Sequence, residues 1–378
     1  MSDAETVGGD MLPLTGVRVV EWAGLGPVPF AAMLLADMGA DIVRIARPGT
    51  PPVSESAIDR GRRVVILDTR EAVDRQKALD LIALADIMLE GHRPGVLERM
   101  GFDPARLREI NPRLIVGRMT AWGQDGPMAQ KAGHDINVLA LGGFLAAVES
   151  AERPAVPLNI VADYGGGSLY LLMGVLAALL QTRTTGTGRT VDCAMSDGLA
   201  SLMSLQAAML SSGSANPDRG SNLLDGGAHF YAVYPCQDSG FIAVGAIEPK
   251  FYANLLGALD LSSDVDLAHQ YDRSRWPICR QKLARKFSER SRDEWAAFFE
   301  PFDACVTPVL SLTEAFDLPH FKERRVYAPY FGTITPAIAP RMGERAVLPP
   351  PPSPANFDII LQEWSAPMTV MPVQQGTS

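Results

Sequence analysis

Residues 17–119 alternate between short apolar segments rich in β-branched residues and longer amphipathic segments. Strands are predicted over residues 17–22, 41–45, 63–67, 86–89 and 114–119. Helices are predicted between them over residues 31–38, 71–85 and 104–110, the last with Asp103 as N-cap and Pro104 at its first position. Strands that alternate with helices predict an α/β fold with a mostly parallel sheet covered on both faces.

The chain changes character after this region. Long helices are predicted over residues 168–181 and 196–210 around a strand at 190–194, and a stretch rich in Ser, Gly, Asn and Asp at 211–227 is typical of a linker. A hairpin at 230–234 and 241–246, followed by helices over 250–259, 276–287 and 293–299, predicts a second, smaller α+β domain. Ser291 and Glu294 have the spacing of a capping box.

Composition limits the possible functions. With 378 residues, 47% of them hydrophobic, the chain is long enough for two domains, and its net charge of -9 argues against non-specific nucleic-acid binding. The four widely spaced cysteines predict neither disulfides nor a zinc site and fit a cytoplasmic location. Met1–Asp10 lacks the pattern of a signal peptide, and the apolar run 169–180 is too short for a membrane span.

Two short motifs carry candidate proton carriers. The first is Gly133-His134-Asp135-Ile136-Asn137, and the second contains Asp163 followed by the three glycines Gly165–Gly167. An imidazole and a carboxylate facing one ligand suit chemistry that needs two opposed proton carriers, and the glycine amides before a helix suit an oxyanion. The alternative is structural: His134 is an ordinary polar residue and Asp163 caps a helix beginning near Ser168.

Arginines gather around the predicted sheet. The turn Gly24–Pro27 lacks the third glycine of a dinucleotide fingerprint, and Arg44 and Arg47 stand where an NAD site would have an acid. Arginine there suits a phosphate. Further arginines in the same region are Arg60, Arg62, Arg63, Arg70 and Arg93. A solvated face of mixed charge is the alternative interpretation.

A third candidate is Glu248, in Gly245-Ala246-Ile247-Glu248-Pro249. The following proline holds Glu248 extended, so its carboxylate can project from the end of a strand. The alternative is an exposed strand terminus.

Several segments together resemble the family III CoA-transferase superfamily and, within it, the α-methylacyl-CoA racemase branch. They are Leu14–Glu21, Leu35–Asp41, Arg93–Val96, Trp122–Pro127 and Asp303–Val309, and the resemblance to the branch depends on Gly133–Asn137 and Gly245–Pro249. The resemblance implies a Rossmann-like large domain over residues 1–210, completed by a return segment at 316–378. A linker at 211–227 and a small domain at 228–315 lie between them.

The resemblance also implies an interlocked homodimer, with each active site shared between the two subunits. His134 and Asp163 match the family's proton carriers, and Glu248 matches the acid that supports the histidine. The implied substrate is an acyl-CoA, with no metal and no further cofactor. Its CoA moiety would be lined by Arg47, Leu67, Asp68, Thr69, Arg70, Arg93, Gly133, Asp135, Ile136, Asn137 and Val138.

The resulting hypothesis is a racemase that inverts C2 of 2-methyl-branched acyl-CoA thioesters by proton transfer through an enolate. The alternative is a family III CoA-transferase, in which Asp163 forms an acyl-enzyme anhydride. A third possibility is an acyl-CoA binding protein without catalysis.

Overall fold

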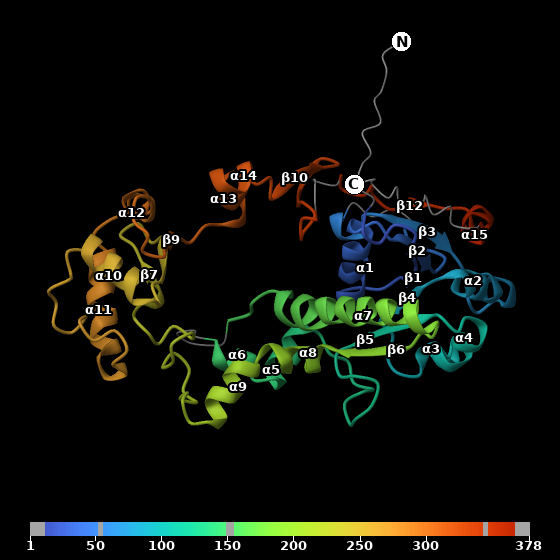
Figure 1. Cartoon of the computed structure of the whole chain (residues 1–378), viewed down its shortest axis with the longest axis horizontal. Helices are drawn as coiled ribbons and strands as arrows, with labels where there is room; N and C mark the ends of the chain where they lie inside the picture. Colours follow the sequence, from blue (N-terminus) through green and yellow to red (C-terminus); the bar gives the residue numbers. More distant parts are fainter. Residues whose placement is uncertain (1–11, 52–55, 149–154, 343–346, 367–378) are drawn as a thin grey trace, which may run out of the picture. The chain divides into compact units, whose positions relative to one another are not determined.

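The computed structural model describes residues 12–51, 56–148, 155–342 and 347–366, and the chain forms two compact units (Figure 1). The first unit combines residues 1–139, 157–202 and 326–378, and the second combines 140–156 and 203–325. The domain boundaries inferred from the sequence stay predictions. Met1–Asp10, which lacks the pattern of a signal peptide, lies outside the described residues.

The first unit contains a parallel sheet of seven strands in the order β12-β3-β2-β1-β4-β5-β6. Its strands are β1 (Arg18–Trp22), β2 (Asp41–Ala46), β3 (Arg62–Ile66), β4 (Ile87–Glu90), β5 (Ile115–Thr120), β6 (Thr190–Ala194) and β12 (Ser353–Pro354). The apolar, β-branched segments are buried because helices cover both faces. The predicted α/β fold class is therefore confirmed.

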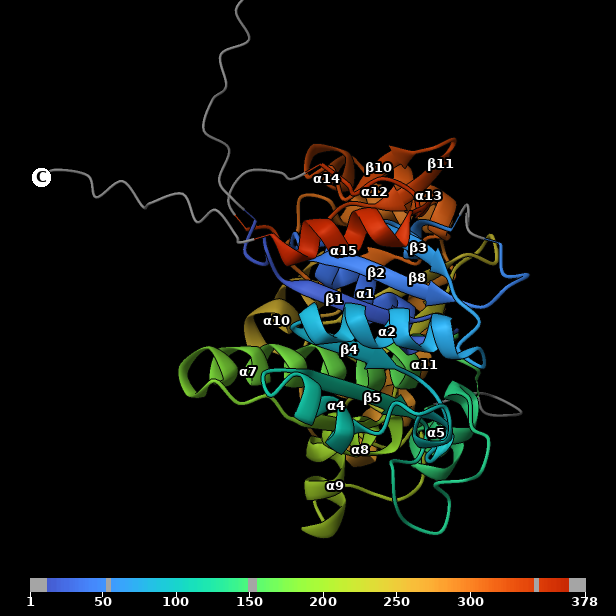
Figure 2. The same cartoon turned by 90° about the vertical axis from the view of Figure 1, so that its right-hand side faces the viewer.

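Helices of the first unit pack on opposite faces of this sheet. On one face lie α1 (Pro27–Asp37) and α7 (Leu169–Thr185), which contact each other and strands of the sheet. On the other lie α2 (Ala72–Leu84), α4 (Pro104–Ile110) and α15 (Phe357–Ser365), which bury an apolar core that includes Phe102 and Trp364 (Figure 2). Asp103 caps α4 as predicted, accepting a hydrogen bond from the Ala105 amide at 2.7 Å.

Buried ion pairs hold the sheet and its surroundings together. The Glu21 carboxylate is fully buried and binds Arg44 at 3.0 Å and Arg62 at 3.1 Å, and Arg44 also binds Asp59 at 2.7 Å. Arg60 binds the buried Asp37 at 2.6 Å. Removing one member would leave a charge buried without its partner, so these arginines are structural.

The helix that carries Asp163 begins earlier than predicted. It starts with π-helical turns over Ile160–Ser168 and continues as α7, so the start expected near Ser168 is wrong. The 26-residue segment Ile160–Thr185 is long and apolar enough to cross a membrane, contrary to the expectation from the shorter apolar run. One such helix is weak evidence for a span, because core helices of soluble proteins also reach this length. Here Leu171 and Val175 pack against Gly117 of β5.

The three glycines after Asp163 permit two helices to touch through their backbones. They lie within the π-helical turns, beside α8 (Met195–Leu202). A Cβ placed on Gly198 would lie 1.8 Å from the Gly166 carbonyl oxygen. The prediction that Gly165–Gly167 offers amides at a helix N-terminus is therefore wrong, because the helix already begins at Ile160.

The second unit has an antiparallel sheet in the order β7-β8-β9 with its own core. Its strands are β7 (Tyr231–Pro235), β8 (Phe241–Gly245) and β9 (Val306–Pro308), and its larger helices are α10 (Pro249–Ala258), α11 (Trp276–Phe287) and α12 (Arg292–Phe299). The Ser291–Glu294 capping box is confirmed. The helix predicted over 196–210 is two helices, α8 and α9 (Ser204–Ser211), because the chain turns at Met203 where one compact unit gives way to the other.

Short elements complete both units. They are α3 (Val96–Arg99), α5 (Asp135–Leu141), α6 (Phe144–Ala147), α13 (Leu312–Asp317), α14 (Pro319–Glu323), β10 (Tyr327–Tyr330) and β11 (Thr333–Pro336), with 3-10 turns at Ala57–Asp59 and Arg273–Arg275.

We predict that Gly198→Ala lowers stability strongly, because its methyl group would meet backbone that cannot move aside. The cost of such overpacking is on the order of 3 kcal/mol. The midpoint of thermal unfolding, followed by circular dichroism, measures it. Gly257→Ala in α10 is the matched control, since its Cβ would only reach ordinary contact with Ser262 at 4.0 Å. Equal midpoints for the two variants would contradict the backbone contact.

Candidate active site

The loops that follow the parallel strands of the first unit share one edge of the sheet. The strand order reverses beside β1, which pairs with β2 on one side and β4 on the other. In open α/β sheets, ligands bind outside the carboxyl ends of the strands near such a reversal. This edge, called the carboxyl edge below, is therefore the expected place for a site.

His134 is exposed and immediately precedes α5. Its main-chain amide donates to Asn137 Oδ1 at 3.1 Å, and the Asn137 amide donates to the His134 carbonyl at 2.9 Å. The preceding Gly133 lies against Trp122, whose ring atoms would be 2.7 Å from an added Cβ. These contacts fix the backbone at His134, while its ring makes no hydrogen bond to any residue that the structure describes.

Asp135 connects the two motifs. Its buried carboxylate accepts hydrogen bonds through Oδ2 from the main-chain amides of Ala162 at 2.7 Å and Asp163 at 2.8 Å. These amides belong to the first turn of the helix that carries Asp163, where a negative charge is stabilised by the helix dipole. The residue after His134 thus holds the turn that bears Asp163.

Asp163 is half-buried and its carboxyl group has a raised pKa. Burial is the main cause, and the negative charge of Asp135 acts in the same direction. A hydrogen bond from Asn159 at 3.3 Å and the nearby His134 work against it. An added Cβ on Gly26, in the turn after β1, would lie 3.6 Å from Asp163 Oδ2. The structure therefore brings His134, Asp135 and Asp163 together at the carboxyl edge.

A cavity of about 210 Å³ opens beside His134. It lies between the loops that follow β4 and β5. Its lining consists of Gly91, His92, Arg93, Pro94, Thr120, Ala121, Trp122, Ala129, Lys131, Ala132, Gly133 and His134. This lining contains basic side chains and no carboxylate, so it suits an anionic ligand.

The other residues predicted to line CoA also follow strands at this edge. Arg47 follows β2 and Arg93 follows β4, both exposed and without an ion pair to any described residue. Leu67–Arg70 follow β3, where Leu67 is buried in the core. Asp68 binds Arg70 at 2.6 Å, and this hydrogen bond is the main cause of the lowered pKa of the Asp68 carboxyl group. In the segment Gly133–Val138, Val138 is buried, whereas Ile136 and Asn137 are exposed.

The structure corrects the interpretation of Arg44 as a phosphate ligand. Glu21 and Asp59 bind its guanidinium group, as described above. Arg63 likewise binds Asp41 at 2.5 Å and also pairs with Glu363. The sequence shows how many arginines the region contains, but their partners come from strands that only the fold brings beside them.

Glu248 belongs to the second unit and is described there alone. It is exposed and extended, and it is the N-cap of α10, separated from the end of β8 by Ala246 and Ile247. Its carboxylate makes no capping hydrogen bond and is therefore not used within that helix.

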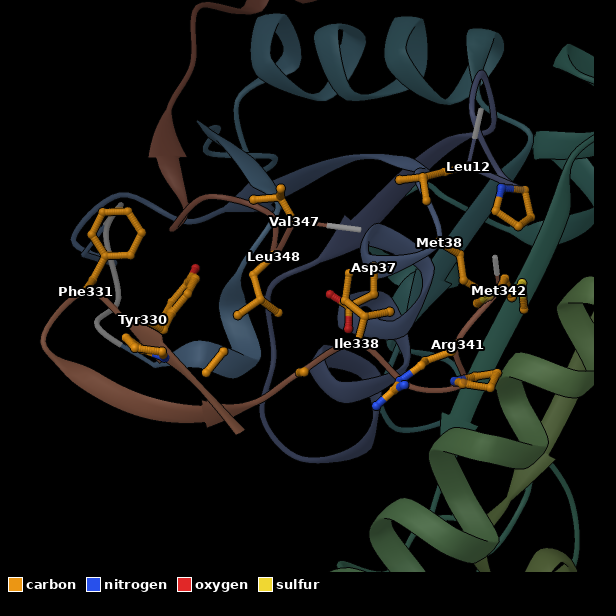
Figure 3. A pocket seen from close by; sticks show the side chains of 15 residues that line it. Leu12, Asp37, Met38, Tyr330, Phe331, Ile338, Arg341, Met342, Val347 and Leu348 are labelled. Carbon is orange, nitrogen blue, oxygen red and sulfur yellow. The ribbon is translucent and has the colours of Figure 1, made fainter. Parts of the chain in front are cut away.

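A larger cavity of about 410 Å³ lies at the opposite edge of the sheet (Figure 3). Its lining is mostly apolar, with Tyr330 and Phe331 at one end and Leu12, Met38 and Met342 at the other. Its acidic residue, Asp37, is already paired with Arg60. The chemistry-bearing side chains are at the carboxyl edge, so the smaller cavity marks the candidate site.

Three residues of the candidate site were missed in the sequence. Trp122 and Lys131 line the cavity, and His92 faces it from the loop after β4. His92 was not among the predicted site residues. Its position directly after a buried strand, next to Arg93, was the available signal.

Known proteins match this chain over most of its length. The model of CoA-transferase family III matches residues 14–355. A Mus musculus protein named alpha-methylacyl-CoA racemase is 43% identical over 312 residues, covering 82% of this chain and 81% of that protein. The Homo sapiens protein of that name is 42% identical over 314 residues, covering 83% and 82%. An acetyl-CoA:oxalate CoA-transferase from Acetobacter aceti is 28% identical over 344 residues, covering 86% and 87%.

Solved structures show the same fold. A hypothetical protein from Mycobacterium tuberculosis superposes with a TM-score of 0.79 at 25% identity, covering 92% of this chain and 98% of that one. A CAIB/BAIF family protein from Brucella suis gives 0.78 at 24% identity, covering 93% and 99%. The family model spans nearly the whole chain and two relatives exceed 40% identity, and the chain therefore belongs to CoA-transferase family III.

Proposed function

We propose that this protein is an acyl-CoA racemase that inverts C2 of 2-methyl-branched acyl-CoA thioesters. The observation that supports the proposal is the Asp135 link: the residue after His134 accepts hydrogen bonds from the turn that carries Asp163, whose carboxyl group has a raised pKa. Relatives at 42–43% identity that are named alpha-methylacyl-CoA racemase support it.

Inversion next to a thioester requires a proton to leave one face of C2 and another to arrive on the opposite face. In one direction neutral His134 accepts the proton and protonated Asp163 donates one; in the other direction the roles exchange. A raised pKa keeps the Asp163 proton bound to higher pH, and it makes the ionised carboxylate a stronger base. Each unit of pKa mismatch with the substrate costs about 1.36 kcal/mol, so a raised value helps when Asp163 is the base.

The thioester oxygen gains negative charge as the proton leaves. The amides of Ala162 and Asp163 already donate to Asp135, and the glycines after Asp163 are packed inside a helix contact. Stabilisation of the enolate therefore needs a donor beyond those glycines, and one preorganised donor contributes on the order of 3 kcal/mol.

The substrate class follows from the family and from the charge of the carboxyl edge. Arg47 and Arg93 are exposed there without ion pairs among the described residues, and they suit the phosphates of CoA. Thr69 and Arg70 after β3 and the segment Gly133–Val138 belong to the proposed CoA lining. The proposed proton transfers need neither a metal nor a redox cofactor, since CoA is itself part of the substrate.

We extend the proposal to a homodimer in which Glu248 of the partner subunit supports His134. The exposed face of the first unit supports association, because Leu169, Met173 and Leu180 on α7 and Leu202 on α8 are each about half or more exposed. The two helices are joined at this face by a Tyr170–Ser201 hydrogen bond of 2.7 Å. Glu248 has no capping role of its own. A cytoplasmic location is proposed with it, in keeping with four free cysteines.

A CoA-transferase is the second candidate, because the family model and the Acetobacter aceti relative carry that name. Asp163 would then attack the thioester carbonyl, releasing CoA thiolate and forming a mixed anhydride. An incoming carboxylic acid would be needed to complete the exchange.

We predict that the protein incorporates deuterium at C2 of a 2-methylacyl-CoA in heavy water, with no carboxylic acid added. His134→Ala and Asp163→Asn should each lower this exchange by about 10²–10⁴-fold, because each removes one proton carrier. Mass spectrometry of the recovered thioester measures the exchange. Absence of exchange across several branched substrates, with Asp163 trapped as a hydroxamate by hydroxylamine, would establish the transferase instead.

We predict that Asp135→Ala lowers kcat for exchange about a hundredfold with little change in KM, because the turn bearing Asp163 loses its anchor. Asp135→Asn should retain more activity, since its carbonyl oxygen still accepts from the two amides.

The same Asn variant tests the electrostatic contribution of Asp135. Its negative charge raises the pKa of Asp163, so removing the charge lowers that pKa. The limb of the pH–rate profile that belongs to Asp163 should shift to lower pH in Asp135→Asn. An unchanged limb, together with equal kcat in the Ala and Asn variants, would refute the anchoring role.

A further inference from the structure

The two peptide groups before Glu248 are held by side chains from a loop elsewhere in the second unit. Both peptide groups lie beyond the end of β8, so their carbonyl oxygens are not paired in the sheet. Gln270 Nε2 donates to the Ala246 carbonyl at 3.0 Å and to the Ile247 carbonyl at 2.8 Å. The Tyr271 hydroxyl group also donates to the Ile247 carbonyl, at 2.6 Å. These two residues are called the Gln270–Tyr271 clamp below.

The contact made by Gln270 requires an amide donor. Its side chain is 8% exposed, and both groups that it meets are carbonyls, which only accept hydrogen bonds. The amide nitrogen, with its two hydrogens, must therefore face them, and one side chain satisfies both. An apolar side chain of the same length would leave the two carbonyls without this donor.

The Gln270–Tyr271 clamp is attached to the core of the second unit. The indole Nε1 of Trp276 donates to the Gln270 carbonyl at 2.9 Å. The Tyr271 ring meets Phe230 edge to face, with ring centres 5.3 Å apart. Trp276 and Phe230 are both buried in that core. The clamp therefore fixes the backbone before Glu248 relative to the core.

Glu248 is held from its other side as well. Its carbonyl oxygen accepts from the Tyr252 amide at 3.0 Å in the first turn of α10, and the following Pro249 keeps its backbone extended. The carboxylate, by contrast, is exposed and makes no hydrogen bond or ion pair to any residue that the structure describes. The second unit thus fixes the backbone of a residue whose carboxylate is available to a group outside that unit.

We propose that Gln270 and Tyr271 are positioning residues, which fix the backbone of Glu248 so that its carboxylate is placed to support His134 of the partner subunit. The inference rests on the proposed function for the role of Glu248. Neither residue touches the substrate in this proposal, so both act on the reaction through Glu248. Gln270 contributes more than Tyr271, because it holds two carbonyls and is buried, whereas Tyr271 holds one and is half exposed.

The test uses Gln270→Met, which keeps the length of the side chain but has no donor. We expect kcat for deuterium exchange to fall between about tenfold and a hundredfold with little change in KM, because a displaced group costs rate rather than binding. Tyr271→Phe removes one hydroxyl group and should give a smaller loss. Gln281→Met, at an exposed glutamine of α11, is the matched control and should behave as the wild type. Circular dichroism shows whether each variant is folded, and Tyr271→Phe carries the same test if Gln270→Met is unfolded.

A double-mutant cycle with Glu248→Ala separates positioning from general stabilisation of the fold. If the clamp acts through Glu248, Gln270→Met should lower kcat in the wild-type background but have little further effect once Glu248 is alanine. A residue that only stabilises the second unit would lower kcat by the same factor in both backgrounds. The same cycle applies to Tyr271→Phe.

Equal losses in the two backgrounds would overturn the inference while leaving the racemase proposal intact. An unchanged kcat in Gln270→Met, or in Glu248→Ala, would overturn it too, since the clamp has no other route to the reaction. A wild-type protein without deuterium exchange would instead refute the racemase proposal, and the positioning role would fall with it.

Discussion

The candidate site depends on the carboxylate of Asp135, which receives two main-chain amides from the first turn of another helix. Hydrogen bonds to a charged group contribute about 1.5–3 kcal/mol each, enough to offset much of the cost of burying that carboxylate. Asp135 follows His134 directly, so the contact sets the position of Asp163 relative to the imidazole. Without this contact, His134 and Asp163 would lie on separate segments, and the position of one relative to the other would not be fixed.

The turn held by Asp135 also packs closely against another helix. Gly166 and Gly198 allow the backbones of the Asp163 helix and α8 to touch, and any side chain at Gly198 would displace a carbonyl group. One end of the Asp163 segment is therefore fixed by hydrogen bonds and the other by close packing. Preorganisation of this kind matters because small displacements of a reacting group can cost about a hundredfold in rate.

The sequence predicted the sheet well because its strands are buried on both faces and read as apolar runs. It also predicted His134 and Asp163 as proton carriers, from short polar residues beside glycines, and that role stays a prediction. Prediction from the sequence failed for residues whose structure depends on partners distant in the chain. Gly165–Gly167 resembled a loop before a helix, because spacing cannot reveal that α8 lies against them.

The arginines show the same limit of sequence-based prediction for charged residues. Arg44 and Arg47 are close in sequence, yet one lies in a buried ion pair with Glu21 and the other is exposed at the carboxyl edge. The difference follows from the two-residue side-chain period of β2 and from its end at Ala46, because Arg47 already lies in the loop.

The direction of the Asp163 pKa shift bears on the choice between the two chemistries. A carboxylate that attacks a thioester must be ionised, and burial that raises its pKa works against ionisation. A proton carrier must pass through both protonation states, and a raised pKa makes the protonated state easier to reach near neutral pH. Asp135 increases the shift with its charge while holding the same turn in place. One buried carboxylate, Asp135, thus holds the turn that bears Asp163 and also adds to the rise in its pKa.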